Sequence, residues 1–297
     1  MTAGEQGFLL LTGYLGDPER RPLTIPQFRN LAKRMQAREK PKEDRELTQT
    51  DLVEMGFDRR FAQQVLTLLS QTEQLHWYLE EGRRRDCHPI TRISQSYPQR
   101  LRSCLGLDAP GVLWTKGDIG LLTQPIIGLV GSRDLLEKNR EFAQQVGYQA
   151  ARQGYVLVSG HARGADRAAQ DSCLEHGGRV ISVVSDQLEK HPLQKNVLYI
   201  SEEGFDLAFS PQRALQRNRI IHSLGCKTFV AQCTLGKGGT WDGTRKNLRF
   251  GWSPVFCFQD GSEASRELAC SGAVGVDMDA LQNLGVLQSN MMCFIDQ

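Results

Sequence analysis

Three glycine-containing turns in the sequence carry residue types that bind phosphate. The first is Gly131-Ser132-Arg133, which directly follows the apolar run at residues 126–130. Glycine lets the backbone approach an anion closely, serine adds a hydroxyl donor, and the forked guanidinium of arginine matches the geometry of phosphate. The turn therefore indicates an anion site at the end of a strand.

Two further turns have a similar composition. One contains Ser159, Gly160, Arg163 and Gly164, and the other contains Lys237, Gly238, Gly239 and Thr240. A single turn of this kind could simply be how a strand ends, whereas three of them favour an anionic ligand. None fits G-x-G-x-x-G or G-x-x-x-x-G-K-[ST], so we expect neither a standard dinucleotide site nor a nucleoside triphosphate site. Asp166 is expected to cap a helix or to hold Arg163 rather than to act in catalysis.

Alternating strands and helices from residue 125 onward would position these turns. Apolar runs typical of strands buried on both faces occupy residues 126–130, 155–158, 179–184, 227–231 and 255–258. Helical patterns separate them at residues 137–153, 165–176, 217–224 and 240–250. Because parallel strands need crossovers of this length, the pattern predicts a Rossmann-like, doubly wound α/β fold with a mainly parallel sheet. Ligands in such folds bind beyond the carboxyl ends of the strands, where the three turns lie.

The first 85 residues predict a small N-terminal helical domain. Apolar residues recur at helical spacing on both sides of Gly56, which indicates a helix, a turn and a second helix of the SAM or helix-hairpin kind. Such a hairpin could contact a nucleic-acid backbone, but a packing role is favoured because the turn lacks a second glycine. Residues 8–15 are typical of a buried helix or strand, and the charged run at residues 38–46 is typical of a solvated linker. We therefore divide the chain into residues 1–85 and 86–297.

Composition excludes several classes of protein. The 297 residues include 36 Lys and Arg against 34 Asp and Glu, which excludes a polycationic tail and an acidic disordered chain. No apolar run approaches the ~20 residues that a membrane helix needs, so we expect no membrane partner. The eight cysteines show no C-x-x-C pair and no histidine at zinc spacing, which is typical of packing thiols in a cytosolic protein without a metal site.

Charge is distributed unevenly along the chain. Residues 211–250 contain eight basic residues and only Asp242 as an acid, whereas residues 251–297 contain one basic and six acidic residues. A stretch with one sign of charge is the electrostatic footprint of a polyanionic partner. Trp241, Phe250 and Trp252 lie in or beside this basic segment and either stack on unpaired bases or belong to the core.

Several motifs, in the same order along the chain, resemble those of the DprA/Smf family, the DNA-processing proteins of bacterial natural transformation. The similarity begins near Pro89, where residues 96–101 resemble the family's "YPxxL" and residues 109–118 resemble "PPxxLyxkGd". The turn at residues 131–133 resembles "VGSR", and the loop at residues 159–166 resembles "SGLARGID". The helix that starts at Arg217 resembles "RNRII".

The resemblance implies a cytoplasmic homodimer that binds single-stranded DNA in a basic pocket, protects incoming DNA and promotes RecA loading in transformation and recombination. It implies no enzymatic activity, no cofactor and no metal. Arg133 would hold a phosphate, Arg217 and Arg219 would line or brace the pocket, and Lys195 would be a second phosphate-binding residue in a segment one residue longer than the family's. Together with the turns, the expected DNA-binding residues are Gly131, Ser132, Arg133, Ser159, Gly160, Arg163, Gly164, Lys195, Arg217, Asn218, Arg219, Lys237, Gly238, Gly239 and Thr240.

The chain also departs from the family pattern. Residues 214–225 replace "FPxRNRIIAGLS" with ALQRNRIIHSLG, and residues 236–243 replace "SGSLxTA" with GKGGTWDG. We therefore expect a divergent member without the C-terminal winged-helix domain that some members append.

Two other functions stay open at this point. The segment 237–240 faintly resembles the "PGGxGTxxE" loop of lysine-decarboxylase-like phosphoribohydrolases, which suggests a nucleotide-binding enzyme or sensor. Against this, the carboxylate that such hydrolysis needs is missing at the expected offset. The third possibility is a structural scaffold in DNA uptake or phage defence with a vestigial pocket.

Overall fold

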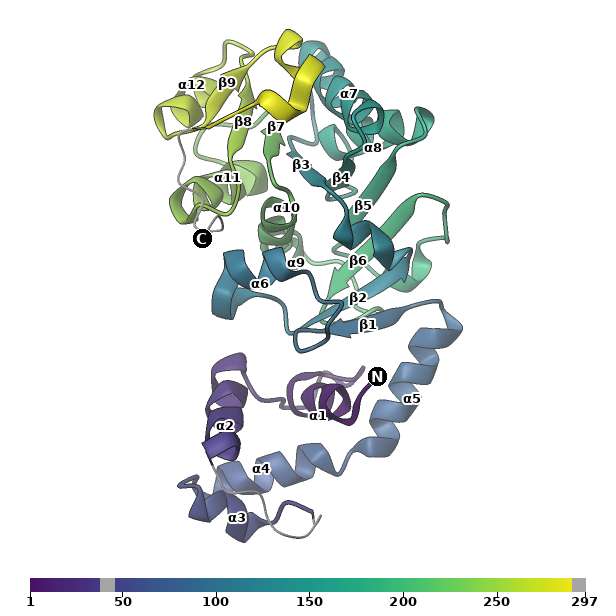
Figure 1. Ribbon diagram of the computed structural model, residues 1–297, viewed down its shortest axis with the longest axis vertical. Coiled ribbons are helices and arrows are strands. Elements are labelled where there is room, and N and C mark those ends of the chain that lie inside the picture. The colour runs from purple at the N-terminus through teal and green to yellow at the C-terminus, as the bar shows by residue number, and fades with distance from the viewer. Residues whose placement is uncertain (38–45, 290–297) are drawn as a thin grey trace.

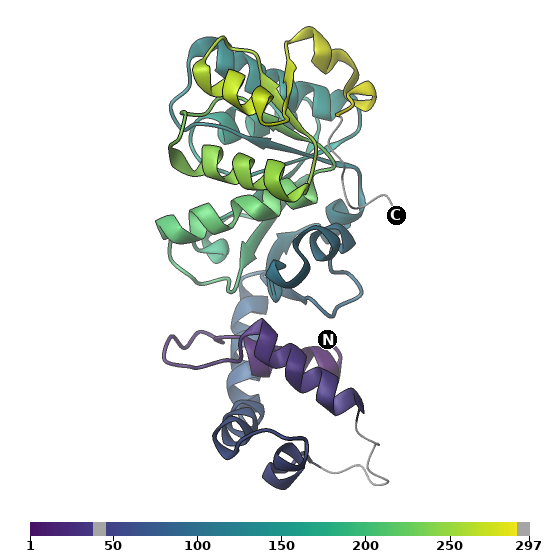
Figure 2. The same ribbon diagram turned by 90° about the vertical axis from the view of Figure 1, so that its left-hand side faces the viewer.

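The computed structural model describes residues 1–37 and 46–289. Within them, a group of N-terminal helices lies at one end of an elongated molecule and a sheet with its covering helices at the other (Figures 1 and 2). The N-terminal helices are α1 (Ala3–Thr12), α2 (Ile25–Ala37), α3 (Gln49–Glu54), α4 (Arg59–Leu69) and α5 (Thr72–Arg84). The predicted linker lies outside the described residues except for Glu46.

The N-terminal helices form a core of their own and dock on the sheet. Apolar side chains of α1, α2, α3 and α4 pack together, including Leu11, Leu31 and Val65. The predicted buried segment at residues 8–15 is largely the second half of α1, and the predicted turn at Gly56 joins α3 to α4 with φ +85°. Among the described residues, no helix is long and apolar enough to cross a membrane.

The remaining chain builds a nine-stranded sheet in the order β1-β2-β6-β5-β4-β3-β7-β8-β9. β1 and β2, and β2 and β6, pair antiparallel, while the six other pairings are parallel. The predicted α/β fold with a mainly parallel sheet is therefore confirmed. The strands are β1 (His88–Thr91), β2 (Val112–Gly117), β3 (Ile126–Val130), β4 (Val156–Ser159), β5 (Arg179–Val183), β6 (Val197–Glu202), β7 (Thr228–Val230), β8 (Val255–Phe258) and β9 (Val274–Val276).

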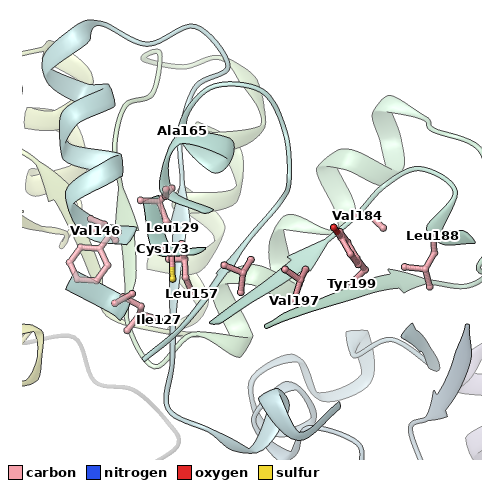
Figure 3. Packing of buried hydrophobic residues seen from close by; sticks show 14 of the residues in the cluster. Ile127, Leu129, Val146, Leu157, Ala165, Cys173, Val184, Leu188, Val197 and Tyr199 are labelled. Carbon is pink, nitrogen blue, oxygen red and sulfur yellow. The ribbon is translucent and has the colours of Figure 1, made fainter. Parts of the chain in front are cut away.

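Helices cover both faces of the sheet because alternate strand residues point in opposite directions. Ile127 and Leu129 of β3 lie in one buried cluster with side chains of α7 and α8 (Figure 3). Ile126 and Val130 belong to the opposite cluster, which includes side chains of α6, α10 and α12. The helices of this region are α6 (Gln99–Leu105), α7 (Glu137–Arg152), α8 (Ala165–Glu175), α9 (Pro211–Gln216), α10 (Asn218–Leu224), α11 (Gly238–Phe250) and α12 (Glu263–Cys270), with short 3₁₀ turns at η1 (Gly106–Asp108), η2 (Ile119–Thr123), η3 (Leu188–Lys190) and η4 (Asp279–Val286).

The strand order creates a topological switch point beside β3. The chain adds β4, β5 and β6 on one side of β3, then returns to add β7, β8 and β9 on the other side. Open α/β sheets bind ligands in the crevice outside the carboxyl ends of the strands at such a point. The turn that starts at Gly131 lies there, because it directly follows β3.

Four strands were not predicted from the sequence: β1, β2, β6 and β9. β1 (HPIT) and β9 (VGV) lack the longer apolar run that located the equally short strands β8 and β7. β2 pairs antiparallel, outside the strand–helix alternation. β6 is parallel to β5, but η3 replaces the helix expected between them. The prediction, which relied on strands alternating with helices, therefore missed β6.

Candidate nucleic-acid interface

Two neighbouring cavities lie at the carboxyl ends of the central strands. The larger, which we call the switch-point cavity, has a volume of about 550 Å³, and the smaller, the side cavity, about 290 Å³. The predicted site residues that line the switch-point cavity are Gly131, Ser132, Arg133, Arg217, Asn218, Lys237, Gly238, Gly239 and Thr240. Those that line the side cavity are Arg133, Gly160, Arg163 and Arg217.

The first two turns touch each other through their glycines. Gly164 has φ +90°, and a Cβ there would overlap the carbonyl oxygens of Ser132 and Arg133. A Cβ on Gly131 would likewise overlap the side chain of Ala165. The Ala165 N–H donates to Ser132 O at 3.1 Å, so the turn after β3 sits directly against the start of α8.

The third turn is tied to the first turn and to α10 by side-chain hydrogen bonds. Thr240 Oγ1 donates to Gly131 O at 2.9 Å, and Asn218 Nδ2 donates to Gly239 O at 2.9 Å. Gly238, Gly239 and Thr240 are the first residues of α11, whose opening N–H groups have no partner within the helix. The positive end of the α11 dipole therefore borders the switch-point cavity.

Arg133 and Lys237 supply the available positive charge of the switch-point cavity. Both side chains are exposed, and neither has a hydrogen bond or an ion pair within residues 1–37 and 46–289. Their donors are therefore free for an external anion. The structure thus places two uncommitted cations, a helix start and two glycine turns around one space, which is suited to phosphate.

Arg163 is also exposed but is paired. Its Nη2 lies 2.6 Å from Asp134 Oδ1, and the two side chains are 76% and 89% exposed. An ion pair this exposed contributes little to stability and is screened by salt. Arg163 can therefore exchange Asp134 for a phosphate at small cost.

Arg217 has an internal role. Its side chain is buried, with Nη2 donating to Gly160 O at 2.8 Å and lying 3.6 Å from Asp166 Oδ2. A Cβ on Gly160 would overlap the guanidinium, so this glycine makes room for Arg217. Burial raises the pKa of the Asp166 carboxyl, and the charge of Arg217 opposes that rise. Arg217 therefore braces the second turn from inside.

Asp166 takes neither of the two roles expected for it, because the N-cap of α8 is Gly164 and Asp166 lies one residue inside the helix. Its Oδ2 accepts the Ala162 N–H at 3.2 Å, just before α8 begins. The idea that it holds Arg163 is wrong, because Arg163 pairs with Asp134 and Asp166 pairs with Arg217. Asp166 and Arg217 are both buried, and a buried carboxylate needs a buried cation.

Some predicted residues lie outside both cavities. Arg219 pairs with Glu202 and donates to Asp108 O at 3.2 Å, on the side facing the N-terminal helices. Lys195 is exposed in the loop between η3 and β6 and lines neither cavity. Ser159 is fully buried at the end of β4, and Gly164 packs beneath the first turn.

The basic segment at residues 211–250 does not form one surface stripe. Arg213 donates to Ser185 O, Leu207 O and Ala208 O, while Lys227 donates to Leu284 O and Gly285 O. The side chains of Arg213 and Lys227 therefore already donate to backbone carbonyls. Lys237 is the lysine of this segment that lines the switch-point cavity. The aromatic residues of this stretch line neither cavity, and Trp252 is buried against Phe250 at a centroid distance of 5.7 Å.

Phe209 and Asp186 are among the cavity-lining residues that sequence reasoning missed. Phe209, 52% exposed, lines both cavities, and Asp186 lines the side cavity. Phe209 lies in the loop between β6 and α9. The apolar run Val197-Leu198-Tyr199-Ile200 was the signal that could have located β6 and, with it, a further loop at the same sheet edge.

Metal and thiol chemistry have little support in the described chain. No group of three or more His, Cys, Asp or Glu side chains there could hold a metal ion. The cysteines that the structure describes are free thiols. Burial raises the pKa of Cys173, Cys233 and Cys257 to about 12, so these thiols stay protonated near neutral pH.

The curated proteins similar to this chain include DNA processing proteins from several bacteria. DNA processing protein DprA of Bacillus subtilis is 30% identical over 167 residues, and DprA of Streptococcus pneumoniae is 33% identical over 163 residues. Each alignment covers 52% of this chain and 54% of the relative. This chain therefore spans about half the length of the curated relatives that it matches.

Solved structures share the fold. The X-ray structure of DprA from Streptococcus pneumoniae matches with a TM-score of 0.70 and 23% identity, covering 93% of this chain and 95% of that one. A Helicobacter pylori DNA processing protein A, whose structure describes a single-stranded DNA binding mode, matches with a TM-score of 0.56 and 23% identity over 66% of this chain and 94% of that one.

A family model described as DNA recombination-mediator protein A matches residues 88–281, which include the whole sheet and both cavities. The match covers well over half of the chain. The expected family is confirmed: this chain belongs to the DNA recombination-mediator protein A family, that of the DprA and Smf DNA-processing proteins.

Proposed function

We propose that this protein binds single-stranded DNA in the switch-point cavity and acts by binding rather than by catalysis. The observation that carries the proposal is that Arg133 and Lys237 are exposed without partners beside the start of α11, at the switch point of the sheet. The described binding mode of the Helicobacter pylori relative adds support from within the family.

The cavity would hold the sugar–phosphate chain through charge and backbone donors. Arg133 would form a forked hydrogen bond with one phosphate, and Lys237 and the N–H groups of the α11 start would face the next. Gly131 and Gly164 allow the first two turns to come this close, and Gly239 allows the third turn to approach Leu215 and Asn218. The predicted contacts of Arg219 and Lys195 are not part of this proposal, because neither residue lines a cavity.

Family membership supports the wider role. We propose that the protein works in the cytoplasm as a homodimer, protects incoming single-stranded DNA and promotes RecA loading during transformation and recombination. The physical basis is that a recombinase needs single strands that have been kept available, and a salt-sensitive phosphate cradle can release them.

The alternative of a nucleotide-cleaving enzyme has less support. Of the two carboxylates that line the switch-point cavity, Asp166 is buried and paired with Arg217, while Asp134 belongs to the first turn and not to the segment 237–240. The carboxylate that such hydrolysis needs is missing at the expected offset after that segment.

A salt titration tests the proposal. Fluorescence anisotropy with a labelled single-stranded oligonucleotide should give a log affinity that falls linearly with log salt, and Arg133→Ala should reduce that slope by about 0.7, the value for one lost phosphate contact on a single strand. The matched control is Arg266→Ala, an exposed arginine on α12 that lines neither cavity.

Two results would count against single-stranded DNA binding in this cavity. One is an unchanged slope in Arg133→Ala, and the other is equal affinity for duplex and single strand. A slope change in the Arg266→Ala control as large as that in Arg133→Ala would show that the effect is one of net charge and does not locate the site.

A further inference from the structure

The side cavity and the switch-point cavity meet along one wall. Arg133, Ala162, Phe209 and Arg217 line both. A phosphate held by Arg133 in the switch-point cavity would therefore lie next to the mouth of the side cavity. In a nucleotide, the group one sugar away from the phosphate is the base.

Besides the arginines Arg133, Arg163 and Arg217, the side cavity has groups that a phosphate site does not need. One wall is the ring of Phe209, which is 52% exposed, and Val184 adds a further apolar surface. Asp186 lines the same space, and a carboxylate repels phosphate. At about 290 Å³ the cavity is at the small end of ligand pockets. An aromatic wall, an acceptor and a small volume suit one nucleobase.

Phe209 is held in place by the backbone on its N-terminal side. Arg213 Nη1 donates to Leu207 O at 2.9 Å and to Ala208 O at 2.8 Å. The same atom donates to Ser185 O at 2.9 Å, next to Asp186. The half-buried Arg213 guanidinium therefore ties the loop after β5 to the loop that carries Phe209, and both loops line the side cavity. A backbone that is already ordered loses little further entropy when its side chain stacks on a ligand.

Asp186 has acceptor capacity left for a ligand. His191 Nε2 lies 2.9 Å from its Oδ1, and the side chain is still 51% exposed. The hydrogen bond from His191 lowers the pKa of Asp186, so the carboxylate is ionised near neutral pH. Ionised carboxylates accept hydrogen bonds and donate none. The exocyclic amine of cytosine, adenine or guanine can donate to Asp186, whereas thymine has no such amine.

We propose that the side cavity is a nucleobase subsite in which Phe209 stacks on the base of the nucleotide whose phosphate lies at Arg133, and Asp186 accepts from that base's exocyclic amine. This inference rests on the proposed binding of single-stranded DNA and adds the base contact to it. It assigns Phe209 and Asp186 a role that the family motifs at residues 131–133, 159–166 and 217–221 do not contain.

A two-by-two comparison tests the stacking. Anisotropy is measured for the full chain with an oligo-dC strand and with a strand of the same length made of abasic residues. Phe209→Ala should weaken binding of oligo-dC about fivefold or more, the cost of one lost stack, and leave the abasic strand within about twofold. Phe209→Tyr keeps the aromatic ring and should restore oligo-dC binding.

Phe250→Ala is the matched control. Phe250 is 53% exposed but lines neither cavity, so its removal should change neither affinity. If Phe209→Ala weakens both strands equally, or neither, the subsite is refuted while single-stranded DNA binding stands. If wild-type protein shows no Arg133-dependent affinity for either strand, the proposed function itself has failed.

The base preference tests the Asp186 contact. Wild-type protein should bind oligo-dC more tightly than oligo-dT of equal length, and Asp186→Val, which removes the acceptor, should abolish that difference. An unchanged preference in the variant would refute the amine contact. Displacement of oligo-dC by micromolar dCMP would overturn the assignment to a strand, because it would show that the site serves a free nucleotide.

Discussion

Arg133 and Arg217 belong to two motifs of the same family pattern, yet their surroundings give them opposite tasks. Arg133 is exposed with no side-chain partner in the described chain, whereas Arg217 is buried between Gly160 O and Asp166. A solvated cation without a partner can bind a ligand anion without losing an internal contact. A buried cation that neutralises a buried carboxylate cannot leave that carboxylate without a large loss of stability.

Replacing the two arginines should separate these tasks. Arg217→Ala should lower the free energy of unfolding by roughly 3–5 kcal/mol, because Asp166 is left buried without its cation. Arg133→Ala should change it by less than about 0.5 kcal/mol, as for an ordinary surface site. Urea unfolding followed by circular dichroism measures both. Equal losses in the two variants would show that Arg133 is also structural.

The sequence located the turns at residue level but not the partner of each cation. Gly131-Ser132-Arg133 and Lys237 were predicted in an anion site, and the structure places them around one cavity. The pairing of Arg219 with Glu202, and of Arg163 with Asp134, depends on contacts across 17 and 29 residues of chain. Local spacing says nothing about which carboxylate tertiary packing brings to an arginine.

At the scale of elements, α10 and α11 are joined by a buried polar network. Asn247 Nδ2 donates to His222 Nδ1 at 3.0 Å, and Asn247 Oδ1 accepts the Ser253 N–H at 2.9 Å. A nitrogen that accepts a hydrogen bond carries no proton, so His222 is neutral. Burial lowers the pKa of His222 from 6.5 to about 3. This pair of helices holds Asn218 and the α11 start against the first turn.

The network makes stability depend on pH. Below pH 6.5 the unfolded chain protonates His222 while the folded chain does not, so stability is lost as the pH falls from about 6.5 towards 3. The loss from this group should be about 1.4 kcal/mol per pH unit. His222→Gln removes the titrating group, so the wild-type free energy of unfolding should fall more steeply than the variant's between pH 6 and pH 4.5. Parallel curves in urea titrations would contradict this assignment.

The predicted strands were those with a clear apolar run between helical patterns, whereas β1, β2, β6 and β9 were missed. The predicted strand at residues 255–258 and the helix after β3 match β8 and α7 within one residue at each end. β6 was missed because η3 stands where a helix was expected, and with it the loop that carries Phe209. The missing strand therefore explains the missing site residue.

At the scale of the whole molecule, α5 of the N-terminal helices packs on the loop that carries Phe209 and hydrogen-bonds to it. Tyr78 of α5 donates its hydroxyl to Asp206 Oδ1 at 2.7 Å, and its ring packs on Trp114 and Phe205 at centroid distances of 5.2 and 4.8 Å. Burial, together with the charge of Asp206, raises the pKa of Tyr78, so the hydroxyl remains a donor. This docking could not be predicted, because it joins residues 128 positions apart.

The whole-chain prediction of an N-terminal helical group before a Rossmann-like sheet is confirmed, since the similar fold of DprA from Streptococcus pneumoniae covers 93% of this chain. The division at residue 85 stays a prediction. Composition and the alternation of strands and helices were enough to predict the α/β fold class, because both are properties of long segments. The sequence predicted a site at the carboxyl ends of the strands, but the strand order that brings the first and third turns together beside β3 came from the structure.

We propose that the carboxyl ends of β3 and β4 and the start of α11 form one cradle for the phosphates of a single strand. A structure of the full chain with a short oligo-dC strand would show whether they do. We expect one phosphate within hydrogen-bonding distance of the Arg133 guanidinium and another facing the α11 start. A strand bound across the N-terminal helices or along α12, with the switch-point cavity empty, would contradict it.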